Sequence, residues 1–476
     1  MTDPSLNATP ADLAATDDGG AIPAPIPSNI SEIPCGELLM GDVSVAGSLP
    51  QELHAYSPAP AMGSLPTADG LSMKVNLPYR VGFFLASTVG GLSSVCIKQL
   101  LLPIQVSQLD PRTTATSFAL IASLGACAGL IAAPLSGALS DRTISRWGRR
   151  RPWMIGGTML AVIGLLVMAQ ARTLLLLLLG EILAQVGVDS LLATTTSLIP
   201  DRMPEGSRTG LSVLNGMAPI VGGVLGLVLV TRLTNPNVVW QSYSLLAVVS
   251  ACFMVLFLLI LREPSLRQYE AAPFRWRIFL TGFVRPLAYR DFACVLLSRT
   301  LVFLSFTMLG TYTFFYLSQV VRMTAGTAAQ GVATLQLIST GMLVAGALGT
   351  GFAVQRMRRL KTFLVGGALL MAVGLSIMAL FPIWSVLLLA AAIFGSGFGA
   401  FIGLDIVMAV RVLPKATEQG KDLGILHTAI FLALMMSPVM GAVILNTVHS
   451  FVVLFLLAAL SSVLAAAAIL PVKSVP

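Results

Sequence analysis

Long apolar stretches alternate with short polar connections from Tyr79 to the C-terminal end of the chain. A stretch of about 20 apolar residues is long enough to cross the ~30 Å hydrocarbon layer as an α-helix. Membrane β-strands are shorter and alternate apolar with polar residues, which these stretches do not. The pattern therefore predicts an all-α membrane protein with twelve transmembrane helices. Their expected limits are residues 80–106, 114–139, 152–171, 173–199, 209–231, 239–261, 291–319, 328–353, 362–381, 384–410, 423–446 and 449–471.

Composition supports this prediction, because 56% of the residues are hydrophobic and only 11% are charged. Soluble domains carry about 25% charged residues on average. The sequence pI of about 9.5 does not indicate a nucleic-acid partner, since the basic residues lie in short loops between the apolar spans. No nucleotide-binding lysine loop, zinc signature or nucleophile elbow is present, so we expect no enzyme activity, no cofactor and no metal site.

The lysine and arginine residues predict the orientation of the spans. If the N-terminus is cytoplasmic, twenty-three of them lie on the cytoplasmic side and four on the opposite side, while Lys98 and Arg299 lie inside spans. Cytoplasmic loops carry the excess of basic residues in membrane proteins. We therefore expect a multi-pass protein of the cell (inner) membrane with both termini in the cytoplasm.

Two connections divide the chain into expected domains. Residues 1–73 hold nine acidic residues, ten prolines and no lysine or arginine, which predicts a disordered cytoplasmic tail. That segment also lacks the basic and apolar regions of a cleavable signal peptide. The longest later connection, residues 262–290, separates six spans from six. The expected parts are the tail, an N-terminal six-helix bundle at 74–261, this central loop, and a C-terminal bundle at 291–476.

The two halves also resemble each other in a loop. Pro200, Gly206 and Gly210 in the loop after span 4 recur as Pro414, Gly420 and Gly424 after span 10, at a constant offset. Transporters are commonly built from such repeats, with the substrate site at the interface between them. The match predicts two pseudo-symmetric bundles.

The most distinctive local sequence follows span 2 and reads Gly137-Ala-Leu-Ser-Asp-Arg-Thr-Ile-Ser-Arg-Trp-Gly-Arg-Arg-Arg-Pro152. Gly137 would allow the end of span 2 to approach a neighbouring helix closely. Asp141 can accept hydrogen bonds from an arginine or from the free N–H groups of the next helix. Pro152 suits a first helical turn. From composition alone, this loop could also be a simple positive anchor on the cytoplasmic side.

This stretch resembles the loop signature of the major facilitator superfamily, Gly-x-Leu-x-Asp-Arg-x-Gly-Arg-Arg. Its four-residue insertion is similar to the glycoside–pentoside–hexuronide and sucrose–proton symporters. The resemblance implies the major facilitator fold over residues 80–471, and it implies that the loop acts as a cytoplasmic gate latch. The residues to which this role carries over are Gly137, Asp141, Arg142, Gly148, Arg149 and Arg150. Span 4 departs from the drug–proton antiporters, because Glu181 stands where their pattern has an arginine.

Five ionisable residues lie inside predicted spans, where a charge costs at least ~2.5–3.5 kcal/mol. They are Lys98 in span 1, Glu181 and Asp189 in span 4, Arg299 in span 7 and Asp405 in span 10. The resemblance implies that these four spans line a central cavity. The charges therefore indicate a polar pathway through the membrane.

The depths of these residues predict two ion pairs, Lys98 with Glu181 near the outer side and Arg299 with Asp405 near the inner side. Asp189 is left without a basic partner. An unpaired carboxyl group in a low-dielectric environment can take up and release a proton, so Asp189 is the first candidate for a coupling group. The alternative is that these charges form static pairs that only position the helices.

Three glutamines could hydrogen-bond a polyhydroxylated solute, although each could equally bind neighbouring backbone. The full set of candidate substrate- or ion-binding residues is Lys98, Gln105, Glu181, Gln185, Asp189, Arg299, Gln336 and Asp405.

Together these patterns favour a secondary active transporter that moves a small solute by alternating access and is coupled to protons. The resemblance implies that the solute is a sugar or glycoside that enters by symport. The expected partners of the transporter are the solute, protons and the lipid bilayer, and we expect a monomer. One alternative is an exporter of drugs or metabolites. Another is a non-transporting protein of the same fold that assists membrane assembly or handles pigment.

Overall fold

The computed structural model describes residues 76–143, 145–203, 205–235, 238–261, 289–357, 359–412 and 419–472. All regular elements in these ranges are helices. The expected tail, nearly all of the central loop and Pro414 of the repeated loop lie outside the described residues. Sequence predictions about those segments therefore remain predictions.

Twelve of the described helices are long and apolar enough to cross a membrane, which confirms the predicted number of spans. The first half contains α1 (Leu77–Cys96), η5 (Ile97–Leu101), α2 (Leu102–Leu109), α3 (Thr114–Ser140), α4 (Arg151–Gln170), α5 (Leu174–Arg202), α6 (Glu205–Leu233) and α7 (Val239–Ile260). The second half contains α9 (Arg290–Gln319), α10 (Ala325–Met357), α11 (Leu360–Leu380), α12 (Trp384–Val412), α13 (Gln419–Thr447) and α14 (Phe451–Ile469). The first span consists of α1, η5 and α2 in succession.

Local sequence explains several helix boundaries. The side chain of Asn76 accepts a hydrogen bond from the N–H of Tyr79 at 3.2 Å and caps α1. Pro152 lies in the first turn of α4, as predicted. Gly148, in the turn before α4, has φ 95°, a left-handed conformation that glycine adopts without steric cost.

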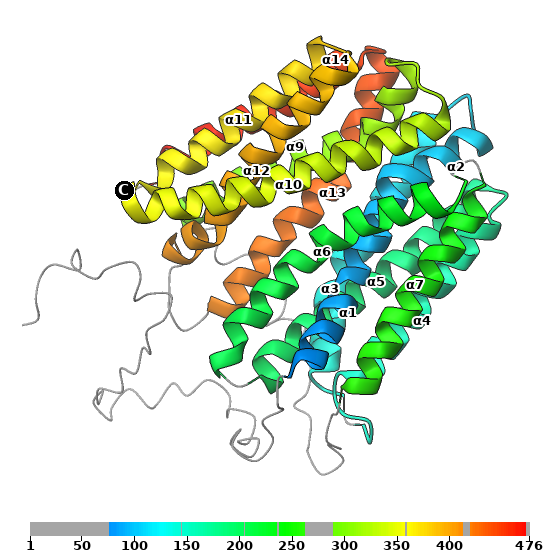
Figure 1. The fold of residues 1–476 in the computed structure, drawn as a ribbon, viewed down its shortest axis with the longest axis vertical. Coiled ribbons are helices and arrows are strands. Elements are labelled where there is room, and N and C mark those ends of the chain that lie inside the picture. The colour runs from blue at the N-terminus through cyan, green and yellow to red at the C-terminus, as the bar shows by residue number, and fades with distance from the viewer. Residues whose placement is uncertain are drawn as a thin grey trace, which may run out of the picture. The chain divides into compact units, whose positions relative to one another are not determined.

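The two halves use the same helix pairs, as expected for a duplicated bundle. In the first half α1 packs against α6 and α7, while α5 packs against α3 and α4, and α4 packs against α7. In the second half α9 packs against α13 and α14, while α12 packs against α10 and α11, and α11 packs against α14. Figure 1 shows the two groups, with the first half in blue to green and the second in yellow to red. The predicted pair of pseudo-symmetric six-helix bundles is confirmed.

Glycines allow these helices to pack closely. A Cβ atom added at Gly399 of α12 would lie 2.0 Å from the carbonyl oxygen of Leu343 in α10. One added at Gly222 of α6 would lie 2.2 Å from the carbonyl oxygen of Thr88 in α1. The glycine-rich sequences of spans 5 and 10 therefore serve helix packing.

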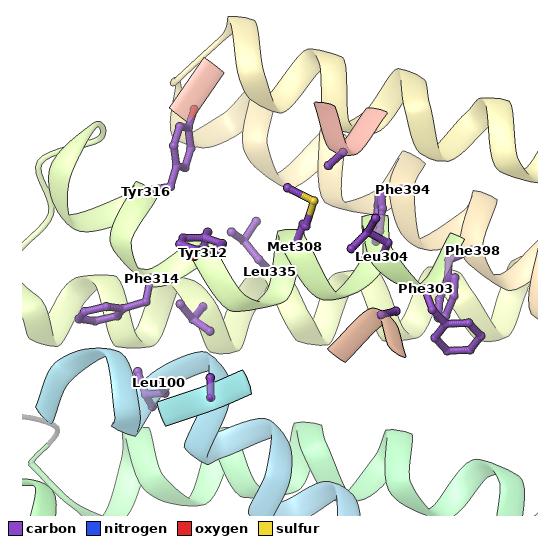
Figure 2. Packing of buried hydrophobic residues seen from close by; sticks show 14 of the residues in the cluster. Leu100, Phe303, Leu304, Met308, Tyr312, Phe314, Tyr316, Leu335, Phe394 and Phe398 are labelled. Carbon is purple, nitrogen blue, oxygen red and sulfur yellow. The ribbon is translucent and has the colours of Figure 1, made fainter. Parts of the chain in front are cut away.

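The buried core extends along α9, where aromatic and aliphatic side chains meet residues of α10, α12 and η5 (Figure 2). Other large apolar side chains point outward, such as Leu175, Leu259 and Phe352, which are 77%, 73% and 72% exposed. A water-facing surface with so many exposed apolar residues would aggregate, whereas a lipid-facing surface requires them. The protein is thus a multi-pass membrane protein.

We call the end of the bundle that holds the α3–α4 connection the basic end, and the opposite end the distal end. The halves meet through α3 with α13 and through α6 with α10. Near the distal end, Asn446 donates a hydrogen bond to Thr116 across the halves at 2.8 Å. The ring of Phe118 in α3 packs edge-on against Tyr312 of α9, with centroids 6.0 Å apart.

The phenol of Tyr312 strengthens this distal contact within the second half. Its hydroxyl donates to the carbonyl of Pro438 in α13 at 2.6 Å. A Cβ atom at Gly441 would lie 2.1 Å from the ring, so the ring packs directly on this glycine. At the basic end, by contrast, a Cβ atom at Gly137 of α3 or Gly349 of α10 would meet no atom within 4 Å.

Candidate functional site

Three polar residues of α5, Glu181, Gln185 and Asp189, lie one turn apart on a single face of the helix. Glu181 is 1% exposed and Asp189 is 5% exposed. The facing helix α3 carries two glycines at the same spacing. A Cβ atom at Gly125 would lie 2.9 Å from a carboxyl oxygen of Glu181, and one at Gly129 would lie 2.0 Å from Oδ2 of Asp189. The glycines thus provide the space that the two carboxyl groups occupy.

Asp189 has one direct polar partner. The side-chain amide of Gln185 donates a hydrogen bond to Oδ2 of Asp189 at 2.7 Å. Among the described residues, the ion pairs involve other groups, which agrees with the prediction that Asp189 lacks a basic partner. Gln185 therefore orients this carboxyl group.

The predicted ion pair between Lys98 and Glu181 is wrong. Both carboxyl oxygens of Glu181 are buried without a hydrogen-bond partner among the described residues. Lys98 interacts electrostatically with Glu181 and Asp189 without pairing with either. The depth argument assumed a regular α-helix, but Lys98 lies in the π-helical turn η5, which changes the direction and height of its side chain.

A further polar group near Glu181 was not identified from the sequence. Tyr243 of α7 is fully buried, and its hydroxyl has no hydrogen-bond partner among the described residues. It lies close enough to Glu181 to interact electrostatically with it. The sequence does not indicate that Tyr243 lies near Glu181, because a buried tyrosine in an apolar span most often serves packing.

The predicted pair between Arg299 of α9 and Asp405 of α12 is confirmed. Their side chains are 7% and 2% exposed. The guanidinium group also lies over the ring of Phe303, 5.5 Å from its centroid. Asp405 borders a cavity of about 10 Å³, enough for about one water molecule. This pair joins two helices of the second half.

The five intramembrane charges therefore form two groups, one in each half. The glutamines also have different environments. Gln105 donates hydrogen bonds to the carbonyl groups of Met168 and Ala171 at 2.8 and 3.3 Å, so it provides donors for free carbonyl groups at the C-terminal end of α4. Gln185 holds Asp189, and Gln336 of α10 borders a pocket. Of the three, Gln336 alone lines this pocket.

This pocket lies between η5 and the helices α9, α10, α11 and α12. Its volume of about 30 Å³ holds about two water molecules. None of the residues that line it carries a charge. Its polar and aromatic lining residues include Gln99, Thr313, Gln336, Ser339, Phe306 and Phe394. Gln99 was missed from the sequence, because it is adjacent to the charged Lys98 and has no distinctive spacing.

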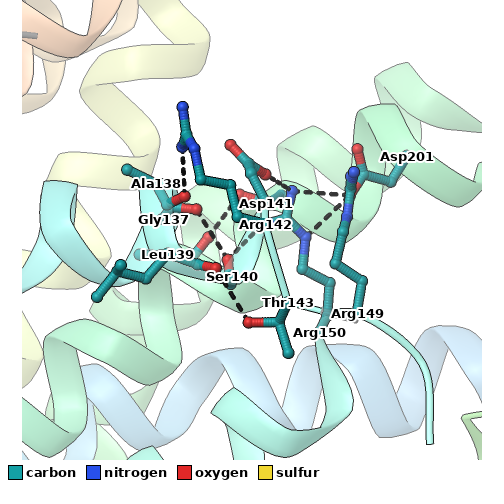
Figure 3. Close-up of polar contacts among 12 residues, drawn as sticks. Gly137, Ala138, Leu139, Ser140, Asp141, Arg142, Thr143, Arg149, Arg150 and Asp201 are labelled. Carbon is teal, nitrogen blue, oxygen red and sulfur yellow. Dashed lines mark hydrogen bonds and ion pairs between the residues drawn. The ribbon is translucent and has the colours of Figure 1, made fainter. Parts of the chain in front are cut away.

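The loop between α3 and α4 forms a charge network at the basic end (Figure 3). Arg150 is 3% exposed and pairs with Asp141 and with Asp201, the latter at 2.8 Å. It also donates to the hydroxyl of Ser140. Arg149 contacts the same oxygen of Asp201 at 2.5 Å. The network thus ties the α3–α4 loop to the end of α5, and Asp201 is a member that the loop sequence alone could not reveal.

The remaining residues of the motif have simpler roles in this conformation. Arg142 donates to the carbonyl of Ala138 at 2.7 Å and so binds the last turn of α3. Gly148 allows the turn described above. The expectation that Gly137 packs closely on a neighbour is not met among the described residues, because none of their atoms lies within 4 Å of a Cβ placed at Gly137.

Comparisons with known proteins agree with this fold. The sequence model of the Major Facilitator Superfamily matches residues 81–358 and 329–476. A general alpha-glucoside permease of Schizosaccharomyces pombe is 31% identical over 121 residues, which make up 22% of each chain. A fujikurins efflux protein of Gibberella fujikuroi is 25% identical over 347 residues, 71% of this chain and 69% of that one.

Solved structures show the same architecture. A bacterial homologue of the human lysosomal transporter Spinster, in an inward-facing and unoccupied conformation, has a TM-score of 0.61 at 16% identity and covers 83% of this chain and 95% of its own. A mutant of the nucleoside transporter NupG has a TM-score of 0.66 at 14% identity and covers 83% and 99%. With its twelve spans and matching sequence, the chain belongs to the Major Facilitator Superfamily and is a membrane transporter, not an enzyme.

Proposed function

We propose that the protein is a secondary active transporter that moves a small neutral solute by alternating access and couples this movement to protons. The observation that carries the proposal is the pair of buried carboxyl groups, Glu181 and Asp189, near the single cation Lys98. One positive charge can balance one carboxylate. The second carboxyl group avoids an uncompensated charge in the membrane by taking up a proton.

A sugar or glycoside is the favoured solute. The uncharged pocket with Gln99 and Gln336 suits hydroxyl groups, which both donate and accept hydrogen bonds. The similarity to an alpha-glucoside permease supports the same class. Export of a metabolite is the second candidate, because the fujikurins efflux protein aligns over most of the chain.

The arrangement of the halves supports alternating access. The distal end is joined by α3, α9 and α13, whereas at the basic end no atom of the described residues lies within 4 Å of a Cβ placed at Gly137 or Gly349. The network around Arg150 holds the α3–α4 loop rigid, as a gate latch requires. In the proposed cycle, the basic end closes on this latch while the distal contacts open. The proposed orientation places both termini and the basic end in the cytoplasm of a monomer in the cell membrane.

Reconstituted proteoliposomes with an imposed pH gradient test the proposal. Sucrose, maltose and uridine serve as probes, with simultaneous recording of solute uptake and proton flux. We expect gradient-driven uptake of a neutral probe by the wild type. In Asp189→Asn and in Glu181→Gln we expect this uptake to fall at least about tenfold, while solute exchange at equal pH continues, since removing a coupling proton site spares solute binding.

The matched control is Asp110→Asn, which changes a half-buried carboxyl group at the α2–α3 turn, where an amide oxygen can still accept the hydrogen bonds of Thr113 and Ser117, and should leave uptake unchanged. Full gradient-driven uptake in both α5 variants would refute coupling through these residues. Uphill extrusion of a cationic dye such as ethidium, with no flux of the neutral probes, would instead favour the exporter.

A further inference from the structure

Gln99 has a side chain without a hydrogen-bond partner in the described part of the protein, although it is only 8% exposed. Its amide nitrogen lies against Gly310 of α9, where an added Cβ atom would be 2.6 Å away. The amide borders the pocket described above, together with Gln336. The amide atoms of Gln99 are not among the fully enclosed polar atoms of the described residues, so the amide can hydrogen-bond a ligand or water in the pocket.

The rest of the pocket suits a neutral ligand with hydroxyl groups. Thr313 and Ser339 add hydroxyl groups to its wall, and Phe306 and Phe394 add apolar ring surfaces. These two rings are stacked with centroids 6.4 Å apart and planes 13° apart. No charged side chain lines the pocket, so an ionic solute would lose its hydration without compensation.

The backbone that carries Gln99 is unusual. Residues 97–101 form the π-helical turn η5, and the N–H that follows it bonds to the carbonyl of Ile97, five residues back. Pro103 explains this, because proline cannot donate a hydrogen bond to the carbonyl of Gln99 and its ring displaces that carbonyl. Such π-turns are frequent at functional sites.

The turn places two adjacent residues in different environments. Lys98 interacts with Glu181 and Asp189 of α5 in the first half, whereas Gln99 borders the pocket of the second half. The titratable groups that interact with Lys98 are these two carboxyl groups; Tyr243 of α7 lies near Glu181, and Gly125 and Gly129 of α3 face the two carboxyl groups.

We propose that η5 couples solute binding to proton uptake in this transporter. Gln99 binds a neutral hydroxyl-bearing solute, and the position of Lys98 determines whether the negative charge of Glu181 or that of Asp189 is balanced. This inference rests on the proposed function and adds its solute contact and its link to protons. When the solute binds Gln99, η5 moves and Lys98 changes its position relative to Glu181 and Asp189. The carboxyl group that Lys98 leaves then takes up a proton from water.

Purified full-length protein in detergent tests this coupling. Thermal-shift titrations with sucrose, maltose and uridine at pH 6 and pH 8 give an apparent Kd for each probe. In the wild type we expect a neutral probe to bind more tightly at pH 6. Gln99→Leu should weaken this binding about tenfold, the effect of losing one or two hydrogen bonds. The matched control Gln330→Leu removes an exposed glutamine of α10 and should change nothing.

A Lys98→Met variant should bind the probe at both pH values with the same affinity, and Lys98→Arg should restore the pH dependence. Unchanged binding by Gln99→Leu, a persistent pH dependence in Lys98→Met, or binding of charged glutamate or ethidium in place of every neutral probe would overturn the proposal. In each of these cases gradient-driven uptake in vesicles would still be measurable. Failure of the coupling role of η5 is therefore distinguishable from failure of the transporter function.

Discussion

Hydrogen-bond partners distinguish the buried charges of this protein from one another. Asp405 has a direct cationic partner, and that partner also contacts an aromatic ring. Both oxygens of Glu181 lack any partner in the described chain. A buried charge that is paired directly with an opposite charge holds structure, whereas a buried carboxyl group without any partner is available for a ligand or proton. We therefore assign a structural role to the Arg299–Asp405 pair.

That structural role predicts a loss of stability when the pair is broken. Arg299→Met leaves Asp405 buried and uncompensated, which should lower the free energy of unfolding by about 3–5 kcal/mol. The double variant Arg299→Met/Asp405→Asn should recover a large part of this loss, because no unpaired charge remains. Thermal unfolding of the purified protein measures both. A double variant as unstable as the single one would show that the charge imbalance is not the cause.

Predictions about individual residues were correct where the helices are regular. The depths of Arg299 and Asp405 were sufficient to predict their pair, because α9 and α12 run without interruption. The same reasoning failed for Lys98, because the π-helical turn before Pro103 changes the direction in which the side chains of the first span point. Gln99 and Tyr243 were missed because the spacing of residues along the sequence does not show that Gln99 borders a pocket or that the hydroxyl of Tyr243 has no hydrogen-bond partner among the described residues.

At the scale of helices, the shape of α3 determines what α5 can carry. Gly125 and Gly129 are four residues apart and face the two carboxyl groups of α5. Such small-residue pairs usually bring helix backbones together. Here they accommodate polar side chains that larger residues would exclude, so the neighbouring helix is part of the candidate site.

Filling the space beside Gly129 is predicted to reduce the coupling of solute uptake to protons. In Gly129→Ala the new methyl group would occupy the position of the Asp189 carboxyl group, which lies only 2.0 Å away. We expect gradient-driven uptake to fall at least about tenfold and stability to fall by about 1–3 kcal/mol. The control Gly156→Ala adds the same methyl group on α4, where no atom lies within 4 Å. Proteoliposome uptake that is equal in the two variants would contradict this role of Gly129.

Helix positions were the most predictable part of the structure, because apolar length is set by membrane thickness. The predicted second span, residues 114–139, compares with Thr114–Ser140 in the structure. The gate motif was less predictable. Its arginines were evident, but Asp201, the acceptor that binds two of them, comes from a helix fifty residues away in the sequence.

For the whole molecule, the repeated helix pairs divide the described helices into two bundles, which move as units in the proposed cycle. The contacts within a half are extensive and glycine-rich, whereas the halves meet along α3 with α13, α6 with α10 and η5 with α9. In the proposed cycle, motion between the bundles concentrates at these contacts. The sequence predicted the two bundles from an internal repeat and a central loop, but it could not show which end is joined.

A covalent link between the two halves at the distal end is predicted to block transport. The side chains of Thr116 and Asn446 meet at 2.8 Å across the halves, so Thr116→Cys/Asn446→Cys places two thiols within reach of a short bis-methanethiosulfonate cross-linker. Cross-linking of this variant should abolish solute uptake, and a reductant should restore it. Each single cysteine variant is the control for the native cysteines. Undiminished uptake by the cross-linked protein would show that transport does not require the distal end to open.

The phenol of Tyr312 has a mechanical consequence for that opening. Pro438 lies inside α13 and removes one backbone hydrogen bond between residues 439–447 and the preceding part of the helix. The Tyr312 hydroxyl and the ring seated on Gly441 attach this short terminal piece to α9 instead. In the proposed cycle, a tilt of α9 would therefore also move the end of α13 that contacts Thr116.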